Sequence, residues 1–293
     1  MKKILMATLL TAVTSIASAQ VVLSGKVSEF VDQTKVGANK STQLVHEPTS
    51  NIAVSVSEKL GNGLTARGVV ETSLHGNTID GNGTKLGDRQ ATVGLATSFA
   101  SVDLGRNVHS QFLAITTNDV FGTLYGSVAG ELHNLRNLRL GDAVFVNVTP
   151  MKNVSVALER TAGAVGGEAT VVGASASFFG VNTSVARFEQ GIEKSTVVGA
   201  NTKLLGNKIA FIHSNEEGVV AKKANTLGVA RDFGPVTAKV SYGKTNNDVT
   251  AYAIGADYNF SKRTAMHVAY RNVDRVGSAS DVSGVGVGLT HRF

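Results

Sequence analysis

The chain ends on Val282-Ser283-Gly284-Val285-Gly286-Val287-Gly288-Leu289-Thr290-His291-Arg292-Phe293. Val285, Val287, Leu289 and Phe293 share one face of an extended strand, and small or polar residues occupy the other face. A period of two with one apolar face is typical of a β-strand that separates two different solvents. This pattern, with an aromatic residue at its end, predicts the last strand of an outer-membrane barrel.

The first twenty residues indicate export. Met1-Lys2-Lys3 is basic, Ile4 to Ile16 is largely apolar, and Ala17-Ser18-Ala19 precedes Gln20 as a small-x-small cleavage site. These features predict a signal peptide over residues 1–19 and a single barrel domain over residues 20–293. A transmembrane anchor is the alternative, but the apolar run is shorter than the ~20 residues that a membrane helix needs. Only helices and closed barrels satisfy every backbone polar group in lipid, so a membrane form of this chain must be a barrel.

The composition agrees with this prediction. The 293 residues include no cysteine, so a disulfide framework is excluded, and 17% are charged. Glycine is frequent at 32 residues and proline rare at 3, as expected for many strands with tight turns. The net charge of +6 becomes +4 once Lys2 and Lys3 leave with the signal peptide, and inside a pore such an excess favours anions. No basic run is interleaved with aromatics, so nucleic acid is not an expected partner.

Short alternating runs follow one another along the rest of the chain. Residues 251–260 place Tyr252, Ile254 and Tyr258 opposite Gly255 and Asp257. Residues 236–242 and 266–271 repeat this dyad, which is typical of barrel strands.

The links between these runs alternate in length. Short links are expected at residues 60–63, 99–101, 150–152, 179–180, 205–207, 233–235 and 260–263, and longer polar ones at 76–86, 190–194, 215–222, 244–248 and 274–281. Such sorting places all short turns at one rim of an up-and-down barrel. The sequence therefore predicts an all-β, transmembrane, antiparallel up-and-down β-barrel of about 16 strands, with 14 strands as the alternative.

One link is much longer than the others. About 30 residues between Arg106 and Arg139 lack a clear dyad. Loops longer than ~15 residues are usually functional or disordered. We expect this loop, which follows the fifth strand, to fold inward and constrict a water-filled barrel; a mobile surface loop is the alternative.

Five stretches resemble the general porins of β-proteobacteria, the neisserial type: residues 57–66, 88–95, 102–106, 258–264 and 288–293. They read SEKLGNGLTA, DRQATVGL, VDLGR, YNFSKRT and GLTHRF. The resemblance implies an outer-membrane homotrimer that passes small hydrophilic solutes and ions by passive diffusion, without a cofactor. It also implies contact with outer-membrane lipid and lipopolysaccharide, and handling by the outer-membrane assembly machinery. Two departures are the absence of the family's arginine around residues 50–53 and Asn147 where tyrosine is usual.

Charged residues are the candidate pore-lining groups. On the third strand, Arg67 and Glu71 share the face expected to line the lumen, since an arginine facing lipid at mid-depth costs about 2–4 kcal/mol. Arg89 and Arg106 resemble constriction arginines of the family. Simple alternation puts Arg106 on the lipid side, so a bulge or the end of the strand must intervene if it lines the pore. Arg139 is a further basic candidate.

Four more charges complete the candidate set. Lys239 and Arg271 face the lumen by alternation. Asp119 and Glu131 on the long loop are candidates for a negative wall that creates a transverse field, or alternatively are solvated loop carboxylates.

No catalytic, cofactor-binding or metal-binding residue is expected. The chain has no G-x-S-x-G nucleophile elbow, no H-E-x-x-H motif and no Cys/His cluster with metal spacing. The predicted function is an outer-membrane porin with weak anion preference, and the alternative is a surface adhesin or structural barrel, which would need long outer loops. Phe293 is the expected assembly signal, at the periplasmic edge where the last strand meets the first.

Overall fold

A computed structural model of the chain describes residues 19–74, 85–133, 138–163, 167–219, 221–275 and 280–293. The expected signal peptide, apart from Ala19, lies outside the described residues. No helix in the described ranges is long and apolar enough to cross a membrane.

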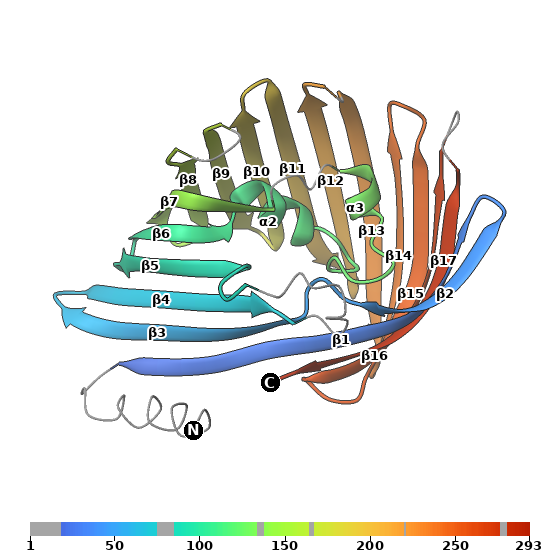
Figure 1. Cartoon of the computed structure of the whole chain (residues 1–293), viewed down its shortest axis with the longest axis horizontal. Helices are drawn as coiled ribbons and strands as arrows, with labels where there is room; N and C mark the ends of the chain where they lie inside the picture. Colours follow the sequence, from blue (N-terminus) through green and yellow to red (C-terminus); the bar gives the residue numbers. More distant parts are fainter. Residues whose placement is uncertain (1–18, 75–84, 134–137, 164–166, 220, 276–279) are drawn as a thin grey trace.

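The described residues form one closed antiparallel sheet (Figure 1). Apart from β2 and β3, which both pair with β1, each strand is hydrogen-bonded to the next one in chain order, and β1 pairs with β17 to close the barrel. The strands are β1 (Gln20–Val36), β2 (Asn39–His46), β3 (Asn51–Gly61), β4 (Leu64–Ser73), β5 (Gln90–Ala96), β6 (Ala100–Val108), β7 (Arg139–Met151), β8 (Val154–Thr161), β9 (Ala169–Phe178), β10 (Val181–Gln190), β11 (Glu193–Leu204), β12 (Asn207–Glu217), β13 (Lys222–Phe233), β14 (Val236–Thr245), β15 (Thr250–Asn259), β16 (Thr264–Asp274) and β17 (Val282–Arg292).

β2 and β3 are two halves of one spanning strand. Both pair antiparallel with β1: β2 with residues 29–36 and β3 with residues 20–26. The interruption between them falls at Glu47-Pro48-Thr49-Ser50, where proline cannot donate to the ladder. The barrel therefore has 16 spanning strands, as the sequence predicts, and the fifth of them is β6.

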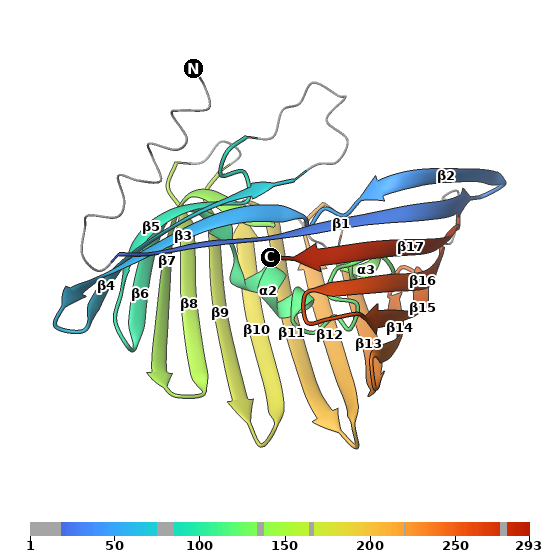
Figure 2. The same ribbon diagram turned by 90° about the horizontal axis from the view of Figure 1, so that it is seen from below.

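The short turns gather at one rim. Figure 2 shows the β7–β8, β9–β10, β11–β12 and β13–β14 links side by side at its lower edge. Asn62-Gly63, Leu205-Gly206 and Gly234-Pro235 are two-residue links of this rim. One expected long link differs: β10 ends at Gln190 and β11 begins at Glu193, so the connection there is only two residues long.

The two faces of each strand meet different surroundings. On β17, Val285, Val287 and Leu289 are exposed, whereas Gly284 and Gly286 are covered by Tyr125 of the loop inside the barrel. Apolar residues thus form the outer face, as a strand in a lipid bilayer requires.

The long loop after β6, of which the structure describes residues 109–133 and which we call L3, lies inside the barrel and carries α2 (Ser110–Thr116) and α3 (Ala129–Leu132) (Figures 1 and 2). Its side chains rest where wall strands have glycine. A Cβ at Gly173 would clash with Ser110, one at Gly228 with Val120, and one at Gly286 with Tyr125; similar contacts occur at Gly199, Gly243 and Gly255. The glycines therefore supply the space that L3 occupies.

The barrel closes at the last residue. Backbone hydrogen bonds of 3.1 Å join Gly25 and Phe293 in both directions, and the Phe293 ring covers Gly25, where a Cβ would lie 2.4 Å from Cζ. Gly25 thus leaves room for the terminal ring at the seam between β1 and β17.

We predict that Gly25→Ala destabilises the barrel by about 1–3 kcal/mol, because the new methyl group overpacks the closing seam. The thermal unfolding midpoint in detergent, read from heat-modified electrophoretic mobility, measures this effect. Gly68→Ala on β4 is the matched control, since its nearest neighbour would lie 3.6 Å from the new Cβ. Equal midpoints for the two variants would contradict the closure role of Gly25.

Candidate pore constriction

The start of L3 is fixed by a buried carboxylate of β8. Glu159 accepts hydrogen bonds of 3.0 Å from the Ser110 backbone N–H and of 2.5 Å from its hydroxyl. His109 caps α2, with its ring accepting from Phe112 N at 3.4 Å. These contacts hold the N-terminus of α2 against the wall, where a negative charge complements the helix dipole.

Asp119, in the middle of L3, stabilises the loop itself. Its side chain is 4% exposed and accepts hydrogen bonds from the backbone N–H groups of Phe121 (3.0 Å) and Thr123 (2.9 Å). Both carboxylate oxygens are thereby used within a turn. We therefore leave Asp119 out of the charged wall that the sequence suggested.

Tyr125 anchors L3 to the first strand. Its hydroxyl donates a 2.5 Å hydrogen bond to Asp32 of β1, and its ring stacks on Phe30 at 5.6 Å. Burial and the bond to Asp32 raise the pKa of Tyr125. The Tyr125 backbone N–H bonds to the carboxylate of Glu47, which is itself buried. L3 thus crosses the barrel and contacts the wall at the interruption between β2 and β3.

Glu131 and His133 hold the far end of L3. Glu131 pairs with Arg271 (3.2 Å) and with Arg275 (3.1 Å), and the Arg271 guanidinium also lies over the Tyr125 ring. His133 is buried between the hydroxyls of Ser214 (2.8 Å) and Thr226 (2.9 Å). Burial, reinforced by nearby Lys222, lowers the pKa of His133 to about 3.

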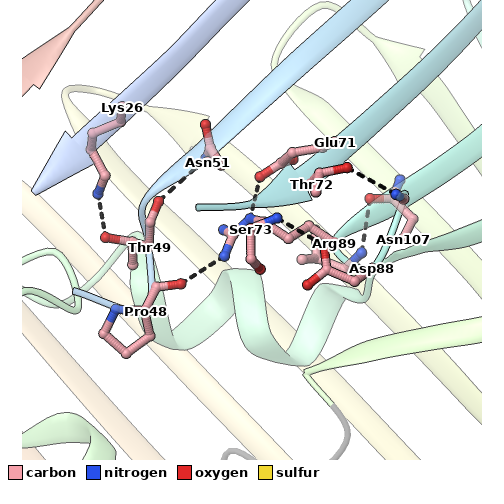
Figure 3. Close-up of polar contacts among 12 residues, drawn as sticks. Lys26, Pro48, Thr49, Asn51, Glu71, Thr72, Ser73, Asp88, Arg89 and Asn107 are labelled. Carbon is pink, nitrogen blue, oxygen red and sulfur yellow. Dashed lines mark hydrogen bonds and ion pairs between the residues drawn. The ribbon is translucent and has the colours of Figure 1, made fainter. Parts of the chain in front are cut away.

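Across the lumen from α2, β4 carries two of the expected charges. Arg67 pairs with Asp103 through two nitrogens and donates a 2.9 Å hydrogen bond to Ser101. Glu71 receives a 2.5 Å bond from Arg89, which also donates to the carbonyl of Pro48 at 2.7 Å (Figure 3). The structure thus brings Glu71 and Arg89 together beside the strand interruption.

Arg106 and Arg139 lie near the end of β6 and the start of β7. The register between these strands shifts after Gly105, whose φ of +124° suits glycine, so the irregularity expected at Arg106 is present. Arg106 Nε donates to the Asp88 carbonyl at 2.6 Å. Within the described ranges, no ion pair joins Arg106 or Arg139 to a carboxylate.

Lys239 lies on another part of the wall. It pairs with Asp257 at 2.5 Å and lies over the Phe121 ring of L3. Asp257 also bonds to His267 (2.8 Å), which continues to Thr290 (3.0 Å). The basic residues expected from the sequence therefore form two groups. One group lies along strands β1–β7, and the other, Lys239 and Arg271, contacts L3.

Sequence reasoning missed several groups of this site. Asp103 could have been predicted from the sequence. The apolar residues Val102 and Leu104 flank it, so alternation places Asp103 on the lumen face. On β8 the alternation of Val156 and Leu158 likewise puts Glu159 on the face opposite to these apolar residues. Glu47 had no such signal, since it sits in a strand interruption that alternation does not reveal.

Comparisons with known proteins agree with this geometry. The sequence model of the family described as Gram-negative porin matches residues 7–292. The major outer membrane protein P.IB of Neisseria meningitidis serogroup B is 28% identical over 342 residues, and that of Neisseria lactamica is 26% identical over 345; both comparisons cover 100% of each chain.

Solved structures share the fold. An anion-selective porin from Comamonas acidovorans superposes with a TM-score of 0.82 at 18% identity, covering 94% of this chain and 100% of that one. Salmonella typhi OmpF in complex with daunomycin gives a TM-score of 0.73 at 16% identity, covering 94% and 98%.

We predict that Tyr125→Phe loosens L3, because the buried Asp32 carboxylate loses a hydrogen bond, at a cost of about 1–3 kcal/mol. Single-channel recordings should show more frequent transitions between current levels than the unmodified chain. Tyr258→Phe, on the outer face, is the control. Equal frequencies of current transitions in the two variants would argue against Tyr125 as an anchor of L3.

Acid should release the far end of L3. An undocked His133 takes up a proton below its ordinary pKa of 6.5, whereas docked His133 stays neutral down to about pH 3. The free energy that holds His133 in its buried site is therefore fully present above pH 6.5. It decreases as the pH falls from 6.5 toward 3. Current fluctuations should rise in that window and stay flatter in His133→Gln; His213→Gln is the control. A pH profile unchanged by His133→Gln would contradict the prediction.

Proposed function

Because the chain belongs to the Gram-negative porin family and forms an outer-membrane channel, we propose that it passes small hydrophilic solutes and ions by passive diffusion with a weak preference for anions. The proposal assigns no catalytic role to any residue. It rests on the charges beside the passage between L3 and strands β1–β7.

The observation that carries the ion preference is a basic cluster, which we define as Lys26, Arg89, Arg106 and Arg139. Three carboxylates, Glu47, Glu71 and Asp88, lie among them, so four positive charges face three negative ones. Arg67 and Asp103 cancel each other nearby. A net excess of one charge supports a weak preference, since the binding of a permeating ion must stay weak enough for it to leave.

Glu71, Lys239 and Arg271 take different parts in the proposal. Glu71 holds Arg89 in place, whereas Lys239 and Arg271 position L3 through Phe121, Tyr125 and Glu131. We therefore assign the field in the passage to the basic cluster and the shape of the passage to the residues that hold L3.

We also propose that the channel is a homotrimer in which partner subunits cover β1 and β2. The side chains of Glu29 and His46 form a polar pair on the outer face of these strands, between Val27, Val31 and Leu44. A carboxylate that faces lipid is costly, so a protein partner is the better neighbour.

The opposite side of the barrel has the features of a lipid-facing surface. Tyr242, Tyr252 and Tyr270 lie toward one end of β14–β16, and Tyr258 with Phe260 toward the short-turn end. The six residue steps from Tyr252 to Tyr258 span about 20 Å, comparable to the apolar band between two aromatic girdles. We propose that this surface contacts outer-membrane lipid and lipopolysaccharide.

Export and assembly complete the proposal. Residues 1–19 act as a cleaved signal peptide, and Phe293 as the feature that the outer-membrane assembly machinery recognises. The pairing of Phe293 with Gly25 supports a role for this residue at the closing seam.

We predict that the double variant Arg106→Gln, Arg139→Gln shifts selectivity toward cations, because the cluster then holds two positive charges against three negative ones. The reversal potential across a planar bilayer under a potassium chloride gradient measures the shift. Arg160→Gln, which removes a solvent-exposed charge paired with Glu168, is the control. Clear cation selectivity of the unmodified channel, or no shift in the double variant, would contradict the proposed preference.

A further inference from the structure

We infer that the lumen wall below α2 is a weak binding site for uncharged polyhydroxylated solutes such as oligosaccharides. This inference rests on the proposed function and names a solute class for the same passage. The site, which we call the neutral wall, consists of Ser155 on β8, Ser175 and Ser177 on β9, Asn182 and Ser184 on β10, and Asn201 on β11.

A cavity of about 590 Å³ lies against the neutral wall and extends to Thr117 and Asn118 at the end of α2. Of its 14 lining residues, 11 carry a hydroxyl or an amide and one, Lys152, is charged. This size falls in the range of small-molecule sites, which are about 300–1,000 Å³. Its lining differs sharply from the wall of β1–β7, where arginines and carboxylates prevail.

The hydroxyls and amides form two parallel rows across neighbouring strands. Ser155 lies opposite Ser175, and Ser175 opposite Ser184, so three hydroxyls line up across β8, β9 and β10. One position nearer the short turns on the same face, Ser177 lies opposite Asn182 and Asn182 opposite Asn201. Together the two rows form a continuous series of hydrogen-bonding groups across the wall, which we call the track.

A chain of hydrogen bonds fixes the orientation of the amides. Ser177 donates to Asn182 (2.7 Å), Asn182 to Asn201 (3.0 Å), and Asn201 to Asn118 of L3 (2.9 Å). An amide has two N–H groups and two lone pairs on its oxygen, so each keeps capacity for a solute. L3 thereby holds one end of the track in place.

The chemistry of this wall matches sugars better than ions or ethers. A sugar hydroxyl donates and accepts at once, as serine hydroxyls and asparagine amides do. Chloride only accepts and potassium needs only acceptors, so neither uses the mixed capacity of the wall. The ether oxygens of a polyethylene glycol only accept hydrogen bonds, and just its two terminal hydroxyls can donate, which makes it a suitable reference solute.

The test compares raffinose with a polyethylene glycol of equal hydrodynamic radius in liposomes that contain the full channel. We expect raffinose to enter faster, by about two- to ten-fold, the ratio that one net hydrogen bond of ordinary strength supplies. In Ser155→Ala, Ser175→Ala, Ser177→Ala the ratio should fall toward one. Ser175→Thr, which keeps the hydroxyl, should retain the unmodified ratio.

The matched control is Ser55→Ala, Ser57→Ala on β3, where Ser57 lies opposite Arg67 on the charged wall. This control should keep the ratio, and ion conductance verifies that each variant has inserted. A ratio of one in the unmodified channel, or an equal fall in control and triple variant, would overturn the inference. Because both solutes are uncharged, a wrong ion preference would leave the ratio intact, whereas a channel closed to both solutes would overturn the proposed function itself.

Discussion

The hydrogen-bonded seam between β1 and β17 is the constraint on which the rest of the molecule depends. In a bilayer every backbone N–H and C=O must be paired within the protein, so a sheet survives there only when its first and last strands meet. β1 meets this demand with 17 residues, pairing with β17 along one edge and with both β2 and β3 along the other. The same strand presents Phe30 and Asp32 to Tyr125, so closure of the barrel also creates the anchor for L3.

L3 can lie inside the barrel because the wall has no side chains at several of the positions that L3 contacts. Glycines on β9, β11, β13, β14, β15 and β17 leave space at the points where L3 side chains touch the wall. Burial of Phe121, Val128 and Leu132 against this wall supplies apolar stabilisation. Glu159, Glu131 and His133 add polar contacts along L3. The passage is therefore bounded by a docked loop on one side and by the basic cluster on the other.

Alternation in the sequence predicted the barrel well because a period of two reports directly which face of a strand meets lipid. It placed Arg67 and Glu71 on the lumen face, but it could not reveal their pairs with Asp103 and Arg89, since register depends on the neighbouring strand. It also required a bulge at Arg106, which Gly105 provides. The use of Asp119 within a turn and the interruption at residues 47–50 escaped it, because both depend on local backbone geometry.

The most direct test of this account is a disulfide between L3 and the wall. The chain has no cysteine, and a Cβ at Gly228 would lie 3.4 Å from that of Val120, close to the spacing of a disulfide. In Val120→Cys, Gly228→Cys the cross-link should form on oxidation, and single-channel conductance should be the same in the oxidised and reduced forms, because the bond holds L3 where it already lies. Failure of the cross-link to form, or a conductance that changes on reduction, would contradict a constriction built from docked L3.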